Sequence, residues 1–233
     1  MNDIGMNQWL AAACLLLTVA VYACARWLYA RHRAIWFAPL LFAPVVLVGI
    51  VLATGIPYPV YMADARWLMW MLGPTTVAFA IPIHDQRAVI RRNPVTIAAG
   101  VVAGVVLGVG SSWLLARAFH LPPELAHSLL PRSVSTPFAV TATDAFGGSR
   151  ELTSLFVVVT GVFGMMTGEL VLRVLPMRSR MARGAMLGAA SHGAGTAKAR
   201  ELGEEEGVVA SLTMTLAGIT LVLVAPLLAG WLG

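Results

Sequence analysis

Residues 184–203 read GAMLGAASHGAGTAKARELG, and residues 121–150 read LPPELAHSLLPRSVSTPFAVTATDAFGGSR. Both stretches are moderately apolar, but both are crowded with Gly, Pro, Ser, Thr and isolated ionisable groups. Because lipid cannot hydrogen-bond exposed backbone, such sequence survives at membrane depth only inside protein or beside a wet cavity. Broken helices expose backbone N–H groups at their ends, and small residues let a ligand approach closely. Both stretches therefore predict broken or re-entrant helices around a binding site.

The composition of the whole chain is that of a membrane protein. Of its 233 residues, 58% are apolar and only 12% are charged, whereas a soluble domain carries about 25% charged residues. A water-soluble globule and a disordered chain are excluded on this basis. At about 20 residues a span, the length predicts one all-α polytopic membrane domain with about 7–8 segments.

Long uncharged runs indicate where the chain crosses the bilayer. Each of them is near or above the length that spans a membrane. The runs are 4–25, 34–63, 67–84, 93–116, 152–168 and 207–233. Gly55, Pro57 and Pro59 are expected to end the second run and leave a short loop before Asp64.

Basic clusters predict the orientation, because Arg and Lys favour the cytoplasmic side. Three clusters follow the first, third and fifth runs: Arg26, Arg31 and Arg33; Arg87, Arg91 and Arg92; Arg173, Arg178, Arg180 and Arg183. They place the N-terminus outside the plasma membrane and serve as topology markers, so nucleic acid is not expected as a partner. Residues 121–150 then either form a re-entrant pair of half-helices or cross once; we favour the former. Residues 184–203 are expected to cross outward, which would relate 67–84 and 184–203 as the broken middle members of two inverted halves.

The first candidate site is PRSVSTP (131–137). Arg132 is costly inside a membrane and suits a carboxylate or phosphate. The hydroxyls of Ser133, Ser135 and Thr136 add donors and acceptors, and a helix restarting at Pro137 aims its N-terminal dipole at the same space. The alternative is a polar surface loop with Arg132 snorkelling.

The second candidate site is SHGAGT (191–196), with Ser191, His192, Gly195 and Thr196. Close packing of helices through small residues is the alternative, but it does not explain His192, which needs a partner if buried. An imidazole titrates near neutrality, so His192 is a candidate for coupling to protons.

A third candidate site lies within LGPTTVAFAIP (72–82), where prolines predict a kinked or broken helix near Pro74, Thr75 and Thr76. An ordinary proline kink is an equal alternative. Asp144 either pairs with Arg132 or binds a cation, or else marks a helix end near the surface. Core breaks are thus expected near 73–82, 131–137 and 191–196.

Motifs of enzymes, metal sites and cofactor sites are not evident in the sequence. The chain is therefore expected to be no enzyme and to need no cofactor.

Four stretches resemble the LrgB/CidB ("antiholin-like") family, which is similar to the C-terminal half of the plastidial glycolate/glycerate translocator. They are LGPTTVAFAIPI (72–83), LLPRSVSTPFAV (129–140), FGGSRELTSLFVVVTGVFG (146–164) and ARGAMLGAASHGAGTAKARELGEEEGVVASLTMTLAGI (182–219). The resemblance implies two functions: holin/antiholin-like control of murein hydrolase activity and lysis beside an LrgA/CidA-type partner, or transport of small monocarboxylates such as glycolate, glycerate or pyruvate. It also implies kinship with carriers that use inverted repeats and elevator-like alternating access.

Breaks rich in Gly, Pro and hydroxyls favour the carrier, because a holin-like pore needs only simple spanning helices. Residues 1–63 would be a scaffold that permits homo-oligomers, and 64–233 the transporting core. The expected ligand is a small organic anion, and coupling to H⁺ or Na⁺ is left open.

Overall fold

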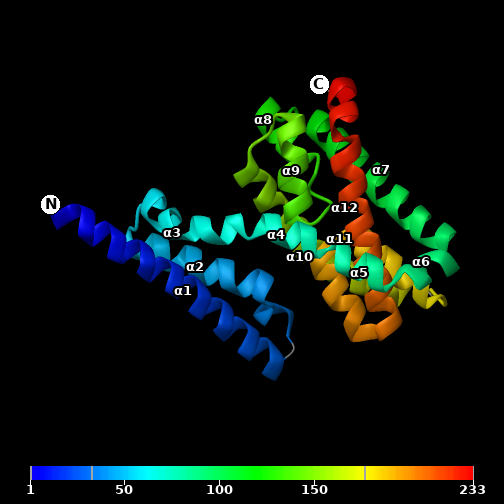
Figure 1. Ribbon diagram of the computed structural model, residues 1–233, viewed down its shortest axis with the longest axis horizontal. Helices are drawn as coiled ribbons and strands as arrows, with labels where there is room; N and C mark the ends of the chain where they lie inside the picture. The colour runs from blue at the N-terminus through cyan, green and yellow to red at the C-terminus, as the bar shows by residue number, and fades with distance from the viewer. Residues whose placement is uncertain (1, 33, 176, 233) are drawn as a thin grey trace. The chain divides into compact units, whose positions relative to one another are not determined.

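The computed structural model describes residues 2–32, 34–175 and 177–232, with the backbone alone at residues 2–7, 35, 169 and 232. Every regular element in these ranges is helical (Figure 1). The chain divides between Pro74 and Thr75 into two compact units.

The first unit contains α1 (Asn2–His32), the 3₁₀ turn η1 (Ile35–Phe37), α2 (Pro39–Thr54) and α3 (Tyr58–Trp70). Gly55 ends α2 in the left-handed conformation, with φ 65°. Pro59 lies in the first turn of α3, where its missing N–H costs nothing. The predicted loop before Asp64 is therefore wrong beyond residue 57, because helix resumes and contains Asp64. A 2.8 Å hydrogen bond between the hydroxyls of Thr18 and Tyr61 joins α1 to α3.

The predicted run 67–84 is divided among several short helices. It covers the end of α3, then α4 (Leu72–Ala78) and α5 (Ala80–Asp85), and α6 (Arg87–Arg92) follows. Pro74 and Pro82 are the third residues of α4 and α5, where a proline lacks no intrahelical hydrogen bond. A new helix therefore begins just ahead of each proline.

The second unit continues with six more helices. They are α7 (Pro94–Ala118), α8 (Pro123–Leu129), α9 (Thr136–Phe146), α10 (Arg150–Val174), α11 (Arg180–Leu202) and α12 (Glu204–Leu232). Within the part of the chain that the structure describes, four stretches are long and apolar enough to cross a membrane: Gln8–His32, Pro94–Ala118, Arg150–Val174 and Glu204–Trp231. The other predicted segments are shorter helices or segments that double back.

Residues 123–146, called here the first hairpin, double back between α8 and α9. Just after α9, the amide of Ser149 donates to Oγ of Ser128 at 2.8 Å, and Oγ1 of Thr153 donates to the carbonyl of Ser128 at 3.0 Å. A Cβ on Gly148 would lie 2.7 Å from the amide nitrogen of Ser128. Gly147 ends α9 with φ 75°. The end of α9 therefore lies beside the end of α8. The turn 130–135, which joins the two helices, forms the tip of the hairpin.

Residues 180–202, called here the second hairpin, double back within α11. His192 has non-helical angles, φ 38° and ψ −121°. A Cβ on Gly195 would collide with the carbonyl oxygen of Leu187, although eight residues of straight helix span about 12 Å. The expectation that 184–203 crosses the membrane is therefore wrong: the left-handed residue at His192 and the small residues around it reverse the chain.

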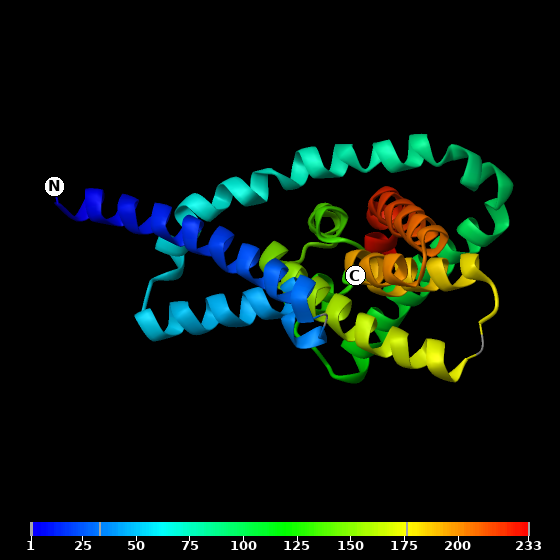
Figure 2. The same ribbon diagram turned by 90° about the horizontal axis from the view of Figure 1, so that it is seen from below.

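Both ends of the second hairpin lie beside the beginning of α12. Arg183 pairs with Glu206 at 2.9 Å, and a Cβ on Gly207 would collide with Cγ of Arg200. Deeper in the bundle, Thr196 contacts the sulfur of Met214 at 3.7 Å. Figure 2 views the molecule from this end.

The two hairpins lie at opposite ends of the second unit, with their tips directed inward (Figure 1). The first hairpin closes against the start of α10 and the second against the start of α12. Residues 123–146 are thus a second segment that doubles back, whereas residues 67–84 form short helices that follow one another. The main core packs the first hairpin against α7, α10 and α12, and includes buried Val105, Val134, Phe138, Val157, Leu212 and Leu221.

Candidate functional site

The tip of the first hairpin carries Arg132, whose guanidinium is surrounded by hydroxyls. Its Nε donates to Ser112 Oγ at 2.9 Å, and its Nη2 donates to Ser111 Oγ at 3.0 Å. Its Nη1 donates to Thr160 Oγ1 at 3.3 Å. These acceptors belong to α7 and α10, so the hairpin tip lies between two long apolar helices.

Among the side chains that the structure describes, no carboxylate lies within ion-pairing distance of Arg132. The guanidinium is also deep within the unit, since Thr160 lies ten residues into α10, or about 15 Å along its axis. A half-buried cation with only neutral partners attracts an anion.

Three other predicted residues share this tip. Ser133 fits against α7 because Gly108 has no side chain, and a Cβ there would lie 2.6 Å from Cβ of Ser133. Ser135 precedes α9 but makes no capping bond, and its buried Oγ has no partner. Thr136 is half-buried and begins α9. The tip thus offers the start of a helix and an unpaired hydroxyl in addition to the cation.

The second tip contains the other predicted cluster. His192 is 4% exposed, and its Nε2 has no partner. Ser191 is fully buried with an unpaired Oγ. Thr196 donates to the carbonyl of His192 at 2.9 Å. Gly195 makes the reversal sterically feasible, as described above.

Both tips meet the middle of α10, at neighbouring residues. Thr160 accepts from Arg132, and a Cβ on Gly161 would lie 2.6 Å from Cε1 of His192. One turn further, Gly164 leaves room for the hydroxyl of Ser191. The first and second candidate sites of the sequence therefore converge on one helix.

The third predicted cluster belongs to α4. Pro74 and Thr75 are exposed there, and Thr76 is half-buried. Directly after α4, Phe79 stacks on Phe138 of the first hairpin, with ring centroids 5.4 Å apart. This stacking connects the third break to the first tip.

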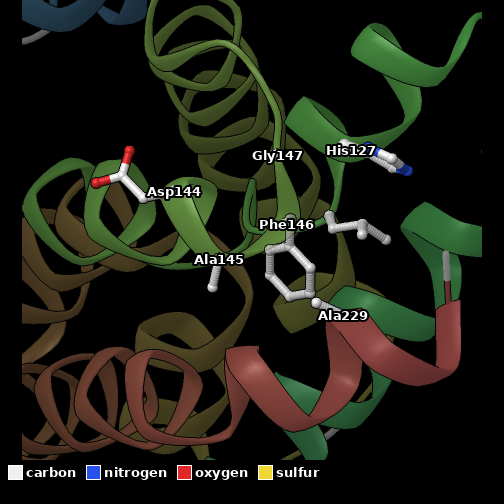
Figure 3. A pocket seen from close by; sticks show the side chains of 7 residues that line it. His127, Asp144, Ala145, Phe146, Gly147 and Ala229 are labelled. Atoms are coloured by element: carbon white, nitrogen blue, oxygen red, sulfur yellow. The ribbon is translucent and has the colours of Figure 1, made fainter.

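Asp144 lies near the open end of the first hairpin, away from Arg132's hydroxyl partners. Its exposed carboxylate forms two hydrogen bonds with Arg150, at 2.8 and 2.7 Å. Asp144 also borders a pocket of about 270 Å³ in which Phe146 lies opposite Ala229 of α12. His127 and Asp144 lie on opposite sides of this pocket (Figure 3).

A larger cavity of about 540 Å³ lies at the other end of the unit. It is lined by α5 and the residue after it, the end of α11 and the first part of α12, and its polar residues are Asp85, Gln86, Arg200, Glu204 and Ser211. Throughout residues 2–32, 34–175 and 177–232, no three His, Cys, Asp or Glu side chains gather as a metal site requires.

Ser111, Ser112 and Thr160 were missed in the sequence because they lie inside apolar runs. The signal that marks the two serines is GVGSS (108–112), in which two adjacent serines follow glycines in a spanning helix. Back-bonding explains why they are tolerated there: both serines donate to the carbonyl of Gly108, at 3.1 and 2.8 Å.

These features define an all-helical membrane protein with two oppositely placed hairpins, the first of which carries a cation held by hydroxyls of α7 and α10. The LrgB-like family model matches residues 18–231, and the chain belongs to this family. Protein YwbG of Bacillus subtilis is 40% identical over 214 residues, covering 92% of this chain and 95% of its own. The holin-like protein CidB of Staphylococcus aureus is 33% identical over 224 residues, covering 96% and 98%. The holin-like protein CidB of Staphylococcus epidermidis is 30% identical over 224 residues, which cover 96% of this chain and 98% of its own. No solved structure matches the chain.

Proposed function

We propose that this member of the holin/antiholin-like family is a carrier for small organic monocarboxylates of the glycolate, glycerate and pyruvate class. The observation that carries the proposal is Arg132, a cation deep in the second unit whose described partners are all neutral. A bound carboxylate would supply the missing charge, with Ser133, Ser135 and Thr136 beside it. Ser191, His192, Gly195 and Thr196 would close the site from the second tip.

Alternating access fits the paired hairpins. We propose that residues 123–174 and 180–232 form the inverted repeat, since each combines a hairpin with a long helix and the two run in opposite directions. Pro74, Thr75 and Thr76 would contribute to the core through α4, and movement of the core against a scaffold at residues 1–63 would be elevator-like. His192 and Asp144 are the candidates for coupling, and imposed H⁺ and Na⁺ gradients distinguish them.

The proposed location is the plasma membrane. The clusters at 87–92 and 173–183 would face the cytoplasm and the N-terminus the outside. Both clusters lie in the second unit, at the end where the second hairpin begins and ends beside α12.

The test is uptake of labelled glycolate, glycerate and pyruvate into proteoliposomes. Wild-type protein should exceed protein-free vesicles, and Arg132→Ala should abolish the difference. Arg117→Ala is the matched control, because Arg117 is an exposed arginine that stacks on Trp113 at 4.4 Å. Uptake of none of the three anions, with an LrgA/CidA-type partner present or absent, overturns the carrier.

The names of the CidB relatives favour a second candidate function. On that account the chain regulates murein hydrolase activity and lysis together with an LrgA/CidA-type membrane partner, or as a homo-oligomer. The regulator predicts that Arg132→Ala leaves a lysis phenotype intact, whereas the carrier predicts that any phenotype caused by transport disappears with uptake.

A further inference from the structure

Three hydroxyls outside the hairpins each bind a different nitrogen of Arg132. Ser111 and Ser112 of α7 accept hydrogen bonds from Nη2 and Nε, and Thr160 of α10 accepts one from Nη1. A guanidinium held at all three nitrogens cannot rotate about its last bonds without breaking a hydrogen bond. Its plane is thereby fixed by residues of two different helices.

The two serines are themselves oriented. Ser111 and Ser112 both donate their hydroxyl protons to the carbonyl of Gly108, at 3.1 and 2.8 Å. Only their lone pairs remain for Arg132, so they act as acceptors. Ser112 is fully buried, which protects this arrangement from water.

Counting donors shows what is left for a ligand. A guanidinium has five N–H groups: one on Nε and two on each terminal nitrogen. The three hydroxyls use one on each nitrogen, so one N–H remains on Nη1 and one on Nη2. We infer that Ser111, Ser112 and Thr160 are positioning residues that aim this remaining pair as a fork at the site, selecting planar carboxylates. The inference rests on the proposed function only where it is tested by transport.

A fork of two coplanar donors matches the two coplanar oxygens of a carboxylate. A tetrahedral anion can also present two oxygens to this pair, but its other two oxygens then lie above and below the plane, where a carboxylate has none. A dianion would also leave one negative charge unbalanced in a site with one described cation. Loss of one positioning hydroxyl should therefore weaken binding and reduce the preference for carboxylates.

The experiment compares Thr160→Val with Thr160→Ser. Valine keeps the shape of threonine without the acceptor, whereas serine keeps the acceptor. Thr167→Val is the matched control, because Thr167 lies on the same helix and its hydroxyl donates to the backbone carbonyls of Phe163 and Gly164, at 2.9 and 3.4 Å. KM and kcat are measured for the labelled acid taken up fastest, with formate and sulfate as competitors.

Thr160→Val should raise KM about tenfold with kcat unchanged, as expected for one hydrogen bond to a charged group. Thr160→Val should also reduce the ratio by which formate competes better than sulfate for uptake. Thr160→Ser and Thr167→Val should match wild type. An unchanged KM in Thr160→Val, or a Thr160→Ser variant as weak as Thr160→Val, overturns the inference.

A binding readout separates this inference from the proposed function. Formate should raise the thermal unfolding temperature of detergent-solubilised wild type and Thr160→Ser, but not of Thr160→Val. If that pattern appears without uptake by wild type, the carrier is overturned and the positioning role stands. If formate stabilises none of the proteins, or all of them equally, the positioning role is overturned.

Discussion

The two hairpins of the second unit carry their arginines at opposite ends. The first hairpin has its arginine at the tip, where every partner that the structure describes for Arg132 is a hydroxyl. The second has its arginines at the base, where Arg183 pairs with Glu206, a residue only 3% exposed. The tip of the second hairpin carries the neutral side chains of Ser191 and Thr196 beside His192.

This difference separates two uses of a half-buried cation. At the base of the second hairpin, the charge is already matched and holds α11 against α12. At the tip of the first, the charge remains available for a ligand. The backbone of the two tips also differs. Ser135 at the first tip has ordinary extended angles, whereas His192 at the second tip has a positive φ in the left-handed region.

Close packing of the second hairpin should give the largest effect. A Cβ on Gly188 would collide with the backbone of Ala210, which cannot move aside. Gly188→Val should therefore yield little monodisperse protein after detergent extraction. Gly110→Val is the control, because nothing lies near that position. Equal yields from both variants would mean that the second hairpin does not contact the backbone of α12.

The ion pair at the base should give the next largest effect. Arg183→Ala leaves the buried Glu206 without its partner and should cost about 3 kcal/mol in unfolding by SDS. Arg180→Ala removes an exposed pair with Glu205, 3.8 Å long, and should cost less than about 1 kcal/mol. Equal losses would show that burial of Glu206 does not matter, and the comparison of the hairpins would fail.

Much of this fold could be predicted from the sequence, since lipid permits few structures. The scarcity of charge indicated long helices, and the polar stretch 121–150 indicated a re-entrant pair. The reversal at His192 was missed because a helix of small residues with one histidine looks the same whether it runs straight or doubles back. Only contacts distant in sequence, such as Arg183 with Glu206, distinguish the two.

The candidate site could be predicted in part for a similar reason. Arg132 is conspicuous as a charge among apolar residues, but its partners Ser111 and Thr160 lie far away in sequence. One internal signal was available: SLFVVVTGVF (154–163) and SLTMTLAGIT (211–220) share Ser-Leu and a later glycine. These glycines, Gly161 and Gly218, receive His192 of the second hairpin and Phe138 of the first.

A pair of substitutions at each tip tests the difference in backbone. His192 is left-handed, so His192→Gly should be more stable than His192→Ala by about 1 kcal/mol. At the first tip Ser135 has φ −66°, so the order should reverse, with Ser135→Ala more stable than Ser135→Gly. Unfolding by SDS measures all four variants. The same order at both tips would remove the contrast in strain.

The exposed pair at the base of the first hairpin should give the smallest effect. Asp144 and Arg150 are both exposed, so water and salt screen their attraction. The base is already held together by two other hydrogen bonds. The amide of Ser149 donates to the hydroxyl of Ser128, and the buried hydroxyl of Thr143 donates to that of Thr153 at 2.8 Å. Asp144→Asn should therefore unfold like wild type at low and at high salt. A loss that matches Arg183→Ala and disappears at high salt would mean that both hairpins depend on ion pairs at their bases. Arg132 would then differ from Arg183 in its position alone, and nothing in the two hairpins would set the charge of Arg132 apart for a ligand.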